Sequence, residues 1–213
     1  MRYLFEYPEI VAGLLLDHLG LTVVTLVIAT AVALPLGWLV HRFRPLAVLV
    51  QGVFGVIYTI PSIALMIMLI PLFGLSVTTV TVALVLYSQI LLVRNTLAGL
   101  AGINPAVMEA ARGMGMNAAQ IALRVQFPLA LPVILAGVRL AAVVTVAIAT
   151  IGAKFGAGGL GTLLFDGIAQ NRMDKIWIGA LAVALLAYAF NQGLRALERR
   201  LGRFRQAGAQ GFV

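Results

Sequence analysis

The chain has 213 residues, of which 62% are hydrophobic and only 10% are charged. Soluble domains are close to half apolar and a quarter charged, so a water-soluble fold of this length could not bury this much apolar surface. The net charge of +8 does not indicate nucleic-acid binding, because the basic residues stand at the ends of apolar runs. The composition therefore predicts an all-α integral membrane protein surrounded by lipid, with no nucleic-acid partner.

Five apolar runs are long enough for a bilayer core about 30 Å thick, which takes roughly 20 residues of helix. We expect spans within 21–40, 46–73, 77–93, 129–151 and 176–194. The second run contains Pro61, which removes an intrahelical hydrogen bond and should kink the helix.

The basic residues between the runs predict the direction of the spans. One side has His41, Arg42, Arg44, Arg94, Arg112, Arg124, Arg195, Arg199, Arg200, Arg203 and Arg205. The other side has Arg2, Lys154, Arg172 and Lys175, offset by Glu6, Glu9, Asp17, Asp166 and Asp174. We expect an external segment 1–20 that is retained rather than cleaved as a signal, a transmembrane domain 21–194 and a cytoplasmic basic tail 195–213. The predicted location is the bacterial inner membrane, with several passes.

Arg139 falls inside the fourth predicted span. One interpretation is that the helix begins in the cytoplasm and that the Arg139 side chain extends to the interface. The other is a functional contact with another subunit.

The segment 94–128 is too long and too polar for a simple helix connection. Asn104 followed by Pro105 is typical of a helix start, with an N-cap and then proline at the first helical position. Glu109 and Arg112 are spaced i,i+3 on that helix, which Gly113 and Gly115 should end.

A second short helix should follow, because Asn117 and Gln120 have the spacing of a capping box. We expect it not to continue regularly beyond Pro128. Both helices are marginal in isolation, so their apolar side chains should dock onto something. The candidates are a groove on a cytosolic partner and the ends of the chain's own helices. The apolar positions are Val107, Met108, Ala110, Ala111, Met114, Met116, Ile121, Ala122 and Val125.

The residues of this segment also resemble a known signature, E-A-A, three residues, G, nine residues, I-x-L-P. The matching positions are Glu109, Ala110, Ala111, Gly115 and Val125 to Pro128, with valine for isoleucine and Phe127 for leucine. The signature marks permeases of binding-protein-dependent ATP-binding cassette (ABC) importers. The resemblance implies a type I importer permease fold whose elbow seats in the ATPase subunit through Glu109, Ala110, Ala111, Arg112, Gly113, Gly115 and Pro128.

That family also implies the partners of the chain. These are a nucleotide-binding ATPase subunit that holds ATP and magnesium, a second permease subunit, identical or paralogous, and a periplasmic or lipid-anchored substrate-binding protein. No cofactor is expected on this chain. The sequence contains no G-x-x-x-x-G-K-[ST] loop, so energy must come from another polypeptide.

Shorter motifs resemble the glycine betaine/carnitine/choline branch of these permeases. They are Tyr58 to Ser62, Val93 to Thr96, Ile151 to Ala153 and Gly156 to Gly161. The expected solute is therefore a quaternary ammonium osmoprotectant, with another small solute such as an amino acid as the alternative. We place six residues on the translocation pathway: Tyr58, Pro61, Ser62, Tyr87, Gly158 and Gly159.

Other interpretations of these residues are weaker. Gly156 to Gly161 fits the dinucleotide fingerprint G-x-G-x-x-G, but an apolar span precedes it where that site needs a strand. The aromatic residues Trp38, Tyr58, Tyr87 and Trp177 could line a passage for cations or could be interfacial anchors. His18 and His41 give no metal-ligand spacing and no catalytic triad, so the chain is not expected to be an enzyme.

Two other classes of membrane protein remain as rivals. An ion-coupled secondary transporter usually carries ionisable residues within its spans, and the five predicted spans contain only Arg139. A membrane scaffold would not need two short helices between its spans with the residue spacing of the importer signature.

Overall fold

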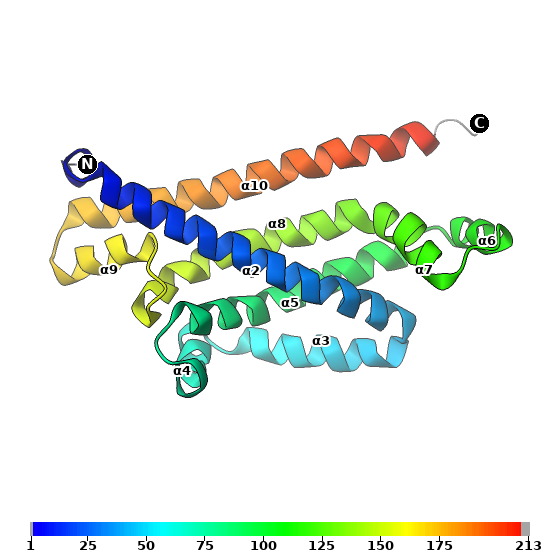
Figure 1. The fold of residues 1–213 in the computed structure, drawn as a ribbon, viewed down its shortest axis with the longest axis horizontal. Helices are drawn as coiled ribbons and strands as arrows, with labels where there is room; N and C mark the ends of the chain where they lie inside the picture. Colours follow the sequence, from blue (N-terminus) through cyan, green and yellow to red (C-terminus); the bar gives the residue numbers. More distant parts are fainter. Residues whose placement is uncertain (1, 210–213) are drawn as a thin grey trace.

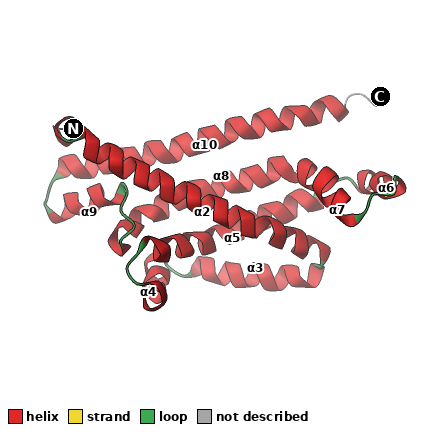
Figure 2. Ribbon diagram, in the orientation of Figure 1, coloured by secondary structure: helices red, strands yellow, loops and turns green. Residues whose placement is uncertain are grey.

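A computed structural model describes residues 2–209, and in it the chain is a bundle of long helices joined by short loops (Figure 1, Figure 2). The long helices are α2 (Pro8–Arg42), α3 (Arg44–Thr59), α5 (Val77–Ala101), α8 (Phe127–Gly152) and α10 (Met173–Ala209). The shorter helical elements are α1 (Arg2–Glu6), α4 (Ser62–Phe73), α6 (Pro105–Gly113), α7 (Ala118–Ile121), the π-helical turn η1 (Ala122–Gln126), the 3-10 turn η2 (Ala153–Phe155) and α9 (Gly161–Ala169). Residues 2–209 contain no strand.

Four of these helical segments are each long and apolar enough to cross a membrane: α2, α5, the continuous rod from α7 to η2, and α10. Counting α3 and α4 as one broken span gives five, which confirms the predicted multi-pass helical architecture. The helix ends differ from the prediction, since α2 begins at Pro8 and α5 continues to Ala101. The reason is that a helix length of roughly 20 residues corresponds only to the hydrocarbon core of the bilayer, whereas real helices extend beyond that core. The predicted tail is likewise part of α10 as far as Ala209, and residues 210–213 lie outside the described residues.

Pro61 breaks the second span instead of kinking it. The chain turns by 101° between α3 and α4, and Ile60 is extended, with φ −67° and ψ 129°. Proline disfavours the helical conformation for the residue before it, here Ile60. Proline also has no backbone N–H to donate, so the helical hydrogen bonding is interrupted at the same place. The expectation of one kinked helix within 46–73 was therefore wrong, although the position of the distortion was right.

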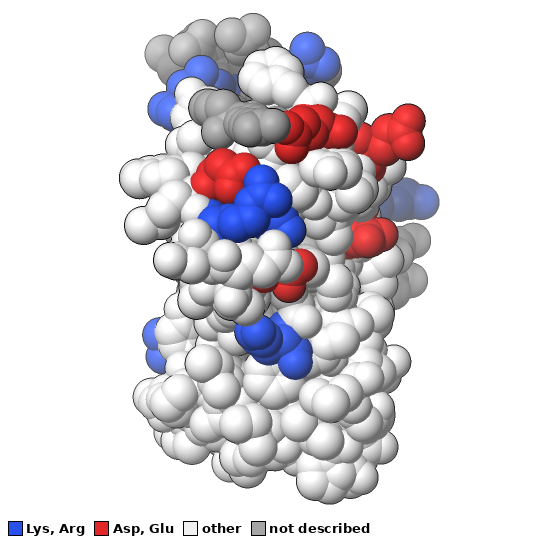
Figure 3. Space-filling model, turned by 90° about the vertical axis from the view of Figure 1, so that its left-hand side faces the viewer, with Lys and Arg blue, Asp and Glu red and all other residues white. Residues whose placement is uncertain are grey.

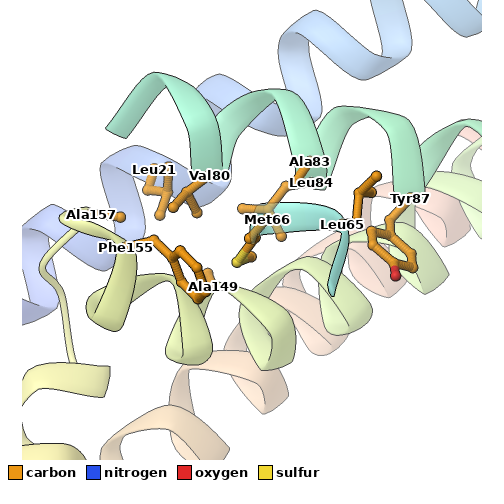
Figure 4. Packing of buried hydrophobic residues seen from close by; sticks show 10 residues of the cluster. All are labelled: Leu21, Leu65, Met66, Val80, Ala83, Leu84, Tyr87, Ala149, Phe155 and Ala157. Atoms are coloured by element: carbon orange, nitrogen blue, oxygen red, sulfur yellow. The ribbon is translucent and has the colours of Figure 1, made fainter. Parts of the chain in front are cut away.

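Helix α5 lies at the centre of the bundle and packs against α2, α3, α4 and α8. Buried side chains from α2, α4, α5, α8 and η2 form one apolar cluster, and Figure 4 shows those of α4 and α5 gathered around Met66. Met66, Val80 and Leu84 have no exposed surface. The second side of the bundle is formed by α10, which packs against α8 and α9.

The long axis of the bundle has two different ends (Figure 1). The N-terminus, α4 and α9 lie at one end, which also carries the loop 156–160, here called the glycine loop. Figure 3 views that end and shows charges of both signs on its upper part and an uncharged lower part. The other end carries the turn from α2 to α3, the C-terminal end of α10 and the elbow, defined as residues 102–121.

Candidate functional site

Helix α6 of the elbow begins as the sequence predicts. The side chain of Asn104 accepts a hydrogen bond from the backbone N–H of Ala106 at 3.0 Å, and Pro105 occupies the first turn. An N-cap of this kind satisfies a donor that has no partner within the helix. Glu109 and Arg112 are both exposed on α6, so their charged groups are available to a partner.

The end of α6 is a tight turn built on Gly115, which has a φ of 75°. The N–H of Met116 donates to the carbonyl of Ala111 at 3.2 Å, and the N–H of Gly115 donates to that of Arg112 at 2.9 Å. This pair of bonds is the Schellman motif, which favours glycine at the left-handed position. Gly113 is the last residue of α6, so both glycines lie where the sequence predicted the helix to end.

A capping box then starts α7. The N–H of Gln120 donates to the side-chain oxygen of Asn117, and the N–H of Asn117 donates to the side-chain oxygen of Gln120, both at 2.9 Å. Caps and turn together fix the angle between α6 and α7 through hydrogen bonds local to the elbow. The elbow is therefore a rigid corner rather than a loose loop.

The second elbow helix does not end at Pro128. It passes through the π-helical turn η1 and continues as α8, with Pro128 in the first turn of α8. Proline is tolerated in a first turn, and the wider turn before it resets the hydrogen-bonding register, with Phe127 donating to the carbonyl of Ala122. The predicted stop was therefore wrong, and the elbow is joined rigidly to the fourth span.

Helix α6 has an inward face and an outward face. Ala111 is 1% exposed, and Met108 packs against the cluster of Leu100, Ile103, Ala130 and Ile134. Val107, Ala110 and Met114 are spaced i, i+3 and i+7 and are exposed, Met114 at 73%. Packing on the chain's own helices thus accounts for the inward side chains, and the ridge Val107–Ala110–Met114 is left without a partner in residues 2–209. We call these three residues the outward ridge.

The structure adds a contact that the sequence did not predict. The indole N–H of Trp38, near the end of α2, donates to the side-chain oxygen of Gln126 in η1 at 3.1 Å. Gln126 is 8% exposed, and a buried amide costs free energy unless it is hydrogen-bonded. The only hint in the sequence is a glutamine within the apolar run Val125 to Leu129. The bond ties the first span to the base of the elbow.

The six predicted pathway residues fall into two groups. Tyr58, Pro61, Ser62 and Tyr87 meet where α3 breaks from α4, and the rings of Tyr58 and Tyr87 lie 5.8 Å apart at 65°. The Tyr87 hydroxyl donates to the carbonyl of Ile60, which satisfies a backbone group that the helix break leaves free. Tyr87 is 4% exposed, so its observed role in this chain is to hold the broken span.

Gly158 and Gly159 lie in the glycine loop, beside α2, and not at the helix break. Both have a positive φ, of 66° and 77°. A Cβ on Gly159 would lie 3.0 Å from Nδ1 of His18. His18 is fully buried within α2, and its Nε2 is 3.1 Å from the carbonyl oxygen of Val146 on α8. His18 thus places an ionisable side chain inside a span, because α2 begins earlier than predicted.

Arg139 contacts α10 in the same chain. Its Nη1 donates to Oδ1 of Asn191 at 3.4 Å, and its Nε lies 3.6 Å from Oε2 of Glu198. These two partners hold α8 and α10 together, with Arg139 and Asn191 each about midway along its helix. Spacing alone could not identify them, because they lie on a helix far along the chain.

The comparisons with known proteins agree with this geometry. The sequence profile of the family described as "Binding-protein-dependent transport system inner membrane component" matches residues 25–203. The "Carnitine transport permease protein OpuCB" of Listeria monocytogenes is 38% identical over 185 residues, which is 87% of this chain and 85% of that protein. The "Osmoprotectant import permease protein OsmW" of Salmonella typhimurium is 38% identical over 203 residues, or 93% and 94% of the two chains.

A third relative and a solved structure extend these matches. The "Glycine betaine/carnitine/choline transport system permease protein OpuCD" of Bacillus subtilis is 40% identical over 185 residues, or 86% of this chain and 81% of its own. An inward-facing structure of the MetNI methionine ABC transporter superposes with a TM-score of 0.84 at 21% identity, over 92% of this chain and 98% of that one. At that identity the superposition shows the fold, which is that of an ABC importer permease.

Proposed function

The chain belongs to the family of inner membrane components of binding-protein-dependent transport systems, the permease subunits of ABC importers, and we propose that its solute is a quaternary ammonium osmoprotectant. The proposal rests above all on relatives 38–40% identical whose names specify carnitine, osmoprotectants, or glycine betaine, carnitine and choline. An amino acid is the weaker candidate, because the methionine transporter resembles this chain at only 21% identity.

ATP hydrolysis in this proposal belongs to a separate subunit that binds ATP and magnesium and docks on the elbow. The outward ridge supports docking, since Val107 and Met114 expose apolar surface on a helix too short to be stable alone. Glu109 and Arg112, exposed beside it, can form charged contacts that fix the register of the partner. Burying a side chain such as Met114 in a groove contributes about 1.5–3 kcal/mol.

The elbow end then faces the cytoplasm of a bacterium, with the N-terminus outside the inner membrane. The cluster of basic residues at that end, including Arg42, Arg112 and Arg199, follows the positive-inside rule. The opposite end, with its mixed charges, receives solute from a periplasmic or lipid-anchored substrate-binding protein. A second permease subunit, identical or paralogous, completes the pathway.

The rigid connections of the elbow suggest how closure of the ATPase subunits moves the spans. A displacement of α6 passes through the Schellman turn and capping box into α7, η1 and α8, which form one continuous helical rod. The bond from Trp38 to Gln126 passes part of that displacement to α2. Alternation between inward-facing and outward-facing states would follow from a rigid elbow acting as a lever.

Uptake and co-purification test the two parts of this proposal separately. The complete transporter with Glu109→Ala should keep its membrane level, lose bound ATPase subunit and lose uptake of labelled glycine betaine. Arg199→Gln, an exposed charge at the same end but on α10, should leave both unchanged. Recovery of undiminished ATPase with Glu109→Ala would contradict the docking role. Uptake of amino acids but not of glycine betaine, carnitine or choline would contradict the solute.

A further inference from the structure

Two adjacent grooves lie at the elbow end. The outward ridge lines neither of them, although Glu109 and Arg112, which lie beside that ridge, line the first groove. The first, of about 650 Å³, runs between the last turn of α2 and α6 and includes His41, Arg42, Glu109 and Arg112. The second, of about 780 Å³, runs between α2 and the rod of α7, η1 and α8. Both volumes lie within the range of about 300–1,000 Å³ that is usual for small-molecule sites.

The two grooves differ sharply in chemistry. The second groove is lined only by apolar residues: Ala31, Leu34, Pro35, Trp38, Ala119, Ala122, Leu123, Phe127, Pro128, Leu131 and Ile134. The first groove contains the charged side chains and is called the polar groove. Trp38 lines both grooves, and its hydrogen bond to Gln126, a residue of the polar groove, lies at the boundary between them. A ligand that straddles Trp38 would need a polar group joined to an apolar chain.

The polar groove favours an anion. Arg42 and Arg112 are exposed, and within the described part of the chain neither forms an ion pair. Glu109 contributes one carboxylate to the same groove, so these three side chains leave one positive charge in excess. Guanidinium groups bind phosphate through paired N–H donors, which a carboxylate on one wall does not prevent.

We propose that these grooves together bind an anionic phospholipid, with its phosphate at Arg42 and an acyl chain along the apolar groove past Trp38. A phospholipid combines the anion and the apolar chain in one molecule and is present wherever a span ends. Basic pockets between membrane helices are known to hold such head groups. The site depends only on the chain being a membrane protein, so it does not rest on the proposed solute.

Trp38 can report directly on the lipid beside it. The chain has two tryptophans, and Trp177 is 63% exposed on α10 near the opposite end, so Trp177→Phe leaves Trp38 as the sole reporter. The full chain is reconstituted in dioleoyl phosphatidylcholine vesicles that contain a small fraction of lipid with brominated acyl chains, either phosphatidylglycerol or phosphatidylcholine. Bromine quenches indole fluorescence only at close range.

Brominated phosphatidylglycerol should quench Trp38 at a bulk fraction about fivefold lower than brominated phosphatidylcholine, the effect expected from roughly one arginine at a membrane surface. Arg42→Gln should remove this preference, and Arg199→Gln should retain it, although both remove one charge from the same end. In a Trp38→Phe chain, Trp177 should show no preference.

Three outcomes would overturn the proposal. Equal quenching of Trp38 by the two lipids would show that the site does not select an anion. A preference that survives Arg42→Gln would contradict a phosphate site at Arg42, and one that Arg199→Gln also removes would assign the preference to general surface charge. Absence of quenching by either lipid would show that no lipid chain occupies the apolar groove and that a second copy of this chain, the one protein in these vesicles, covers it.

Discussion

Two turns at opposite ends of the bundle use glycines with positive φ, and they differ in what surrounds them. At the elbow, Gly115 has a φ of 75°, and a Cβ there would meet no atom within 4 Å. In the glycine loop, Gly159 has a φ of 77°, and a Cβ would lie 3.0 Å from His18. Local hydrogen bonds therefore determine the first turn, whereas packing against α2 also constrains the second. A turn held locally can move as a unit with a partner, while a packed turn anchors its neighbours.

The largest effect on stability should come from Gly159→Val. The substitution forces a branched side chain into the left-handed region and into the His18 ring, so we expect a loss of about 3 kcal/mol or more in the free energy of unfolding. Thermal unfolding of the purified chain in detergent measures it.

Gly158→Val is the matched control for that substitution. Gly158 has a φ of 66°, but its Cβ would meet only Asp17 Oδ2, at 3.8 Å. The free energy of unfolding should therefore fall only by the cost of the left-handed conformation, about 1–2 kcal/mol. Equal losses for the two variants would show that packing on His18 does not constrain the loop.

The next effect should be on transport rather than on folding. Gly115→Leu meets open space in this chain, so its membrane level should stay close to normal, with about 1–2 kcal/mol of backbone strain. The bulk it adds at the elbow should impair seating of the ATPase subunit. We expect uptake to fall about tenfold or more, which corresponds to about 1.4 kcal/mol of coupling free energy.

Gly113→Ala is the control for a side chain added beside this turn without backbone strain. Gly113 is also exposed, meets no atom within 4 Å, and has a φ that is not positive. The change should be neutral or slightly stabilising, because alanine favours a helix more than glycine does. Uptake at the normal rate with Gly115→Leu would contradict the role of this turn in coupling.

The smaller effect on transport should come from Trp38→Phe. The change keeps an aromatic ring but leaves the buried amide of Gln126 without its partner, so it should cost about 1–3 kcal/mol locally. The elbow should remain folded, since its caps do not involve α2. We expect the ratio of solute transported to ATP hydrolysed to drop modestly, with Trp177→Phe as the control that keeps it. An unchanged ratio would show that α2 does not transmit the displacement of the elbow to the other spans.

The same contrast explains which features could be predicted from the sequence. The caps at Asn104 and Asn117 and the turn at Gly115 depend on residues only a few positions apart, so spacing alone identified them. The apolar runs likewise identified the spans, because a bilayer sets their length. Where neighbouring residues decide the conformation, the prediction and the structure agree.

Features that depend on distant residues could not be predicted in this way. The proline at position 61 indicated a distortion, but the 101° turn also needs Tyr87 to satisfy the carbonyl of Ile60. The partners of Arg139 and of Gln126 lie on other helices. The pathway role of Tyr87 and Gly159 stays a prediction, and the fold gives these two residues different contacts.

The central proposal, that the outward ridge of α6 docks an ATPase subunit, can be tested by single-cysteine crosslinking. The chain contains no cysteine, so Met114→Cys, at a position 73% exposed, gives one thiol on the ridge. Trp177→Cys, at a position 63% exposed on α10, gives the control thiol near the opposite end. A short thiol-to-amine crosslinker added to membranes that contain the complete transporter should join the ATPase subunit to Met114→Cys and not to Trp177→Cys. Crosslinking of neither variant, or of both equally, would contradict it.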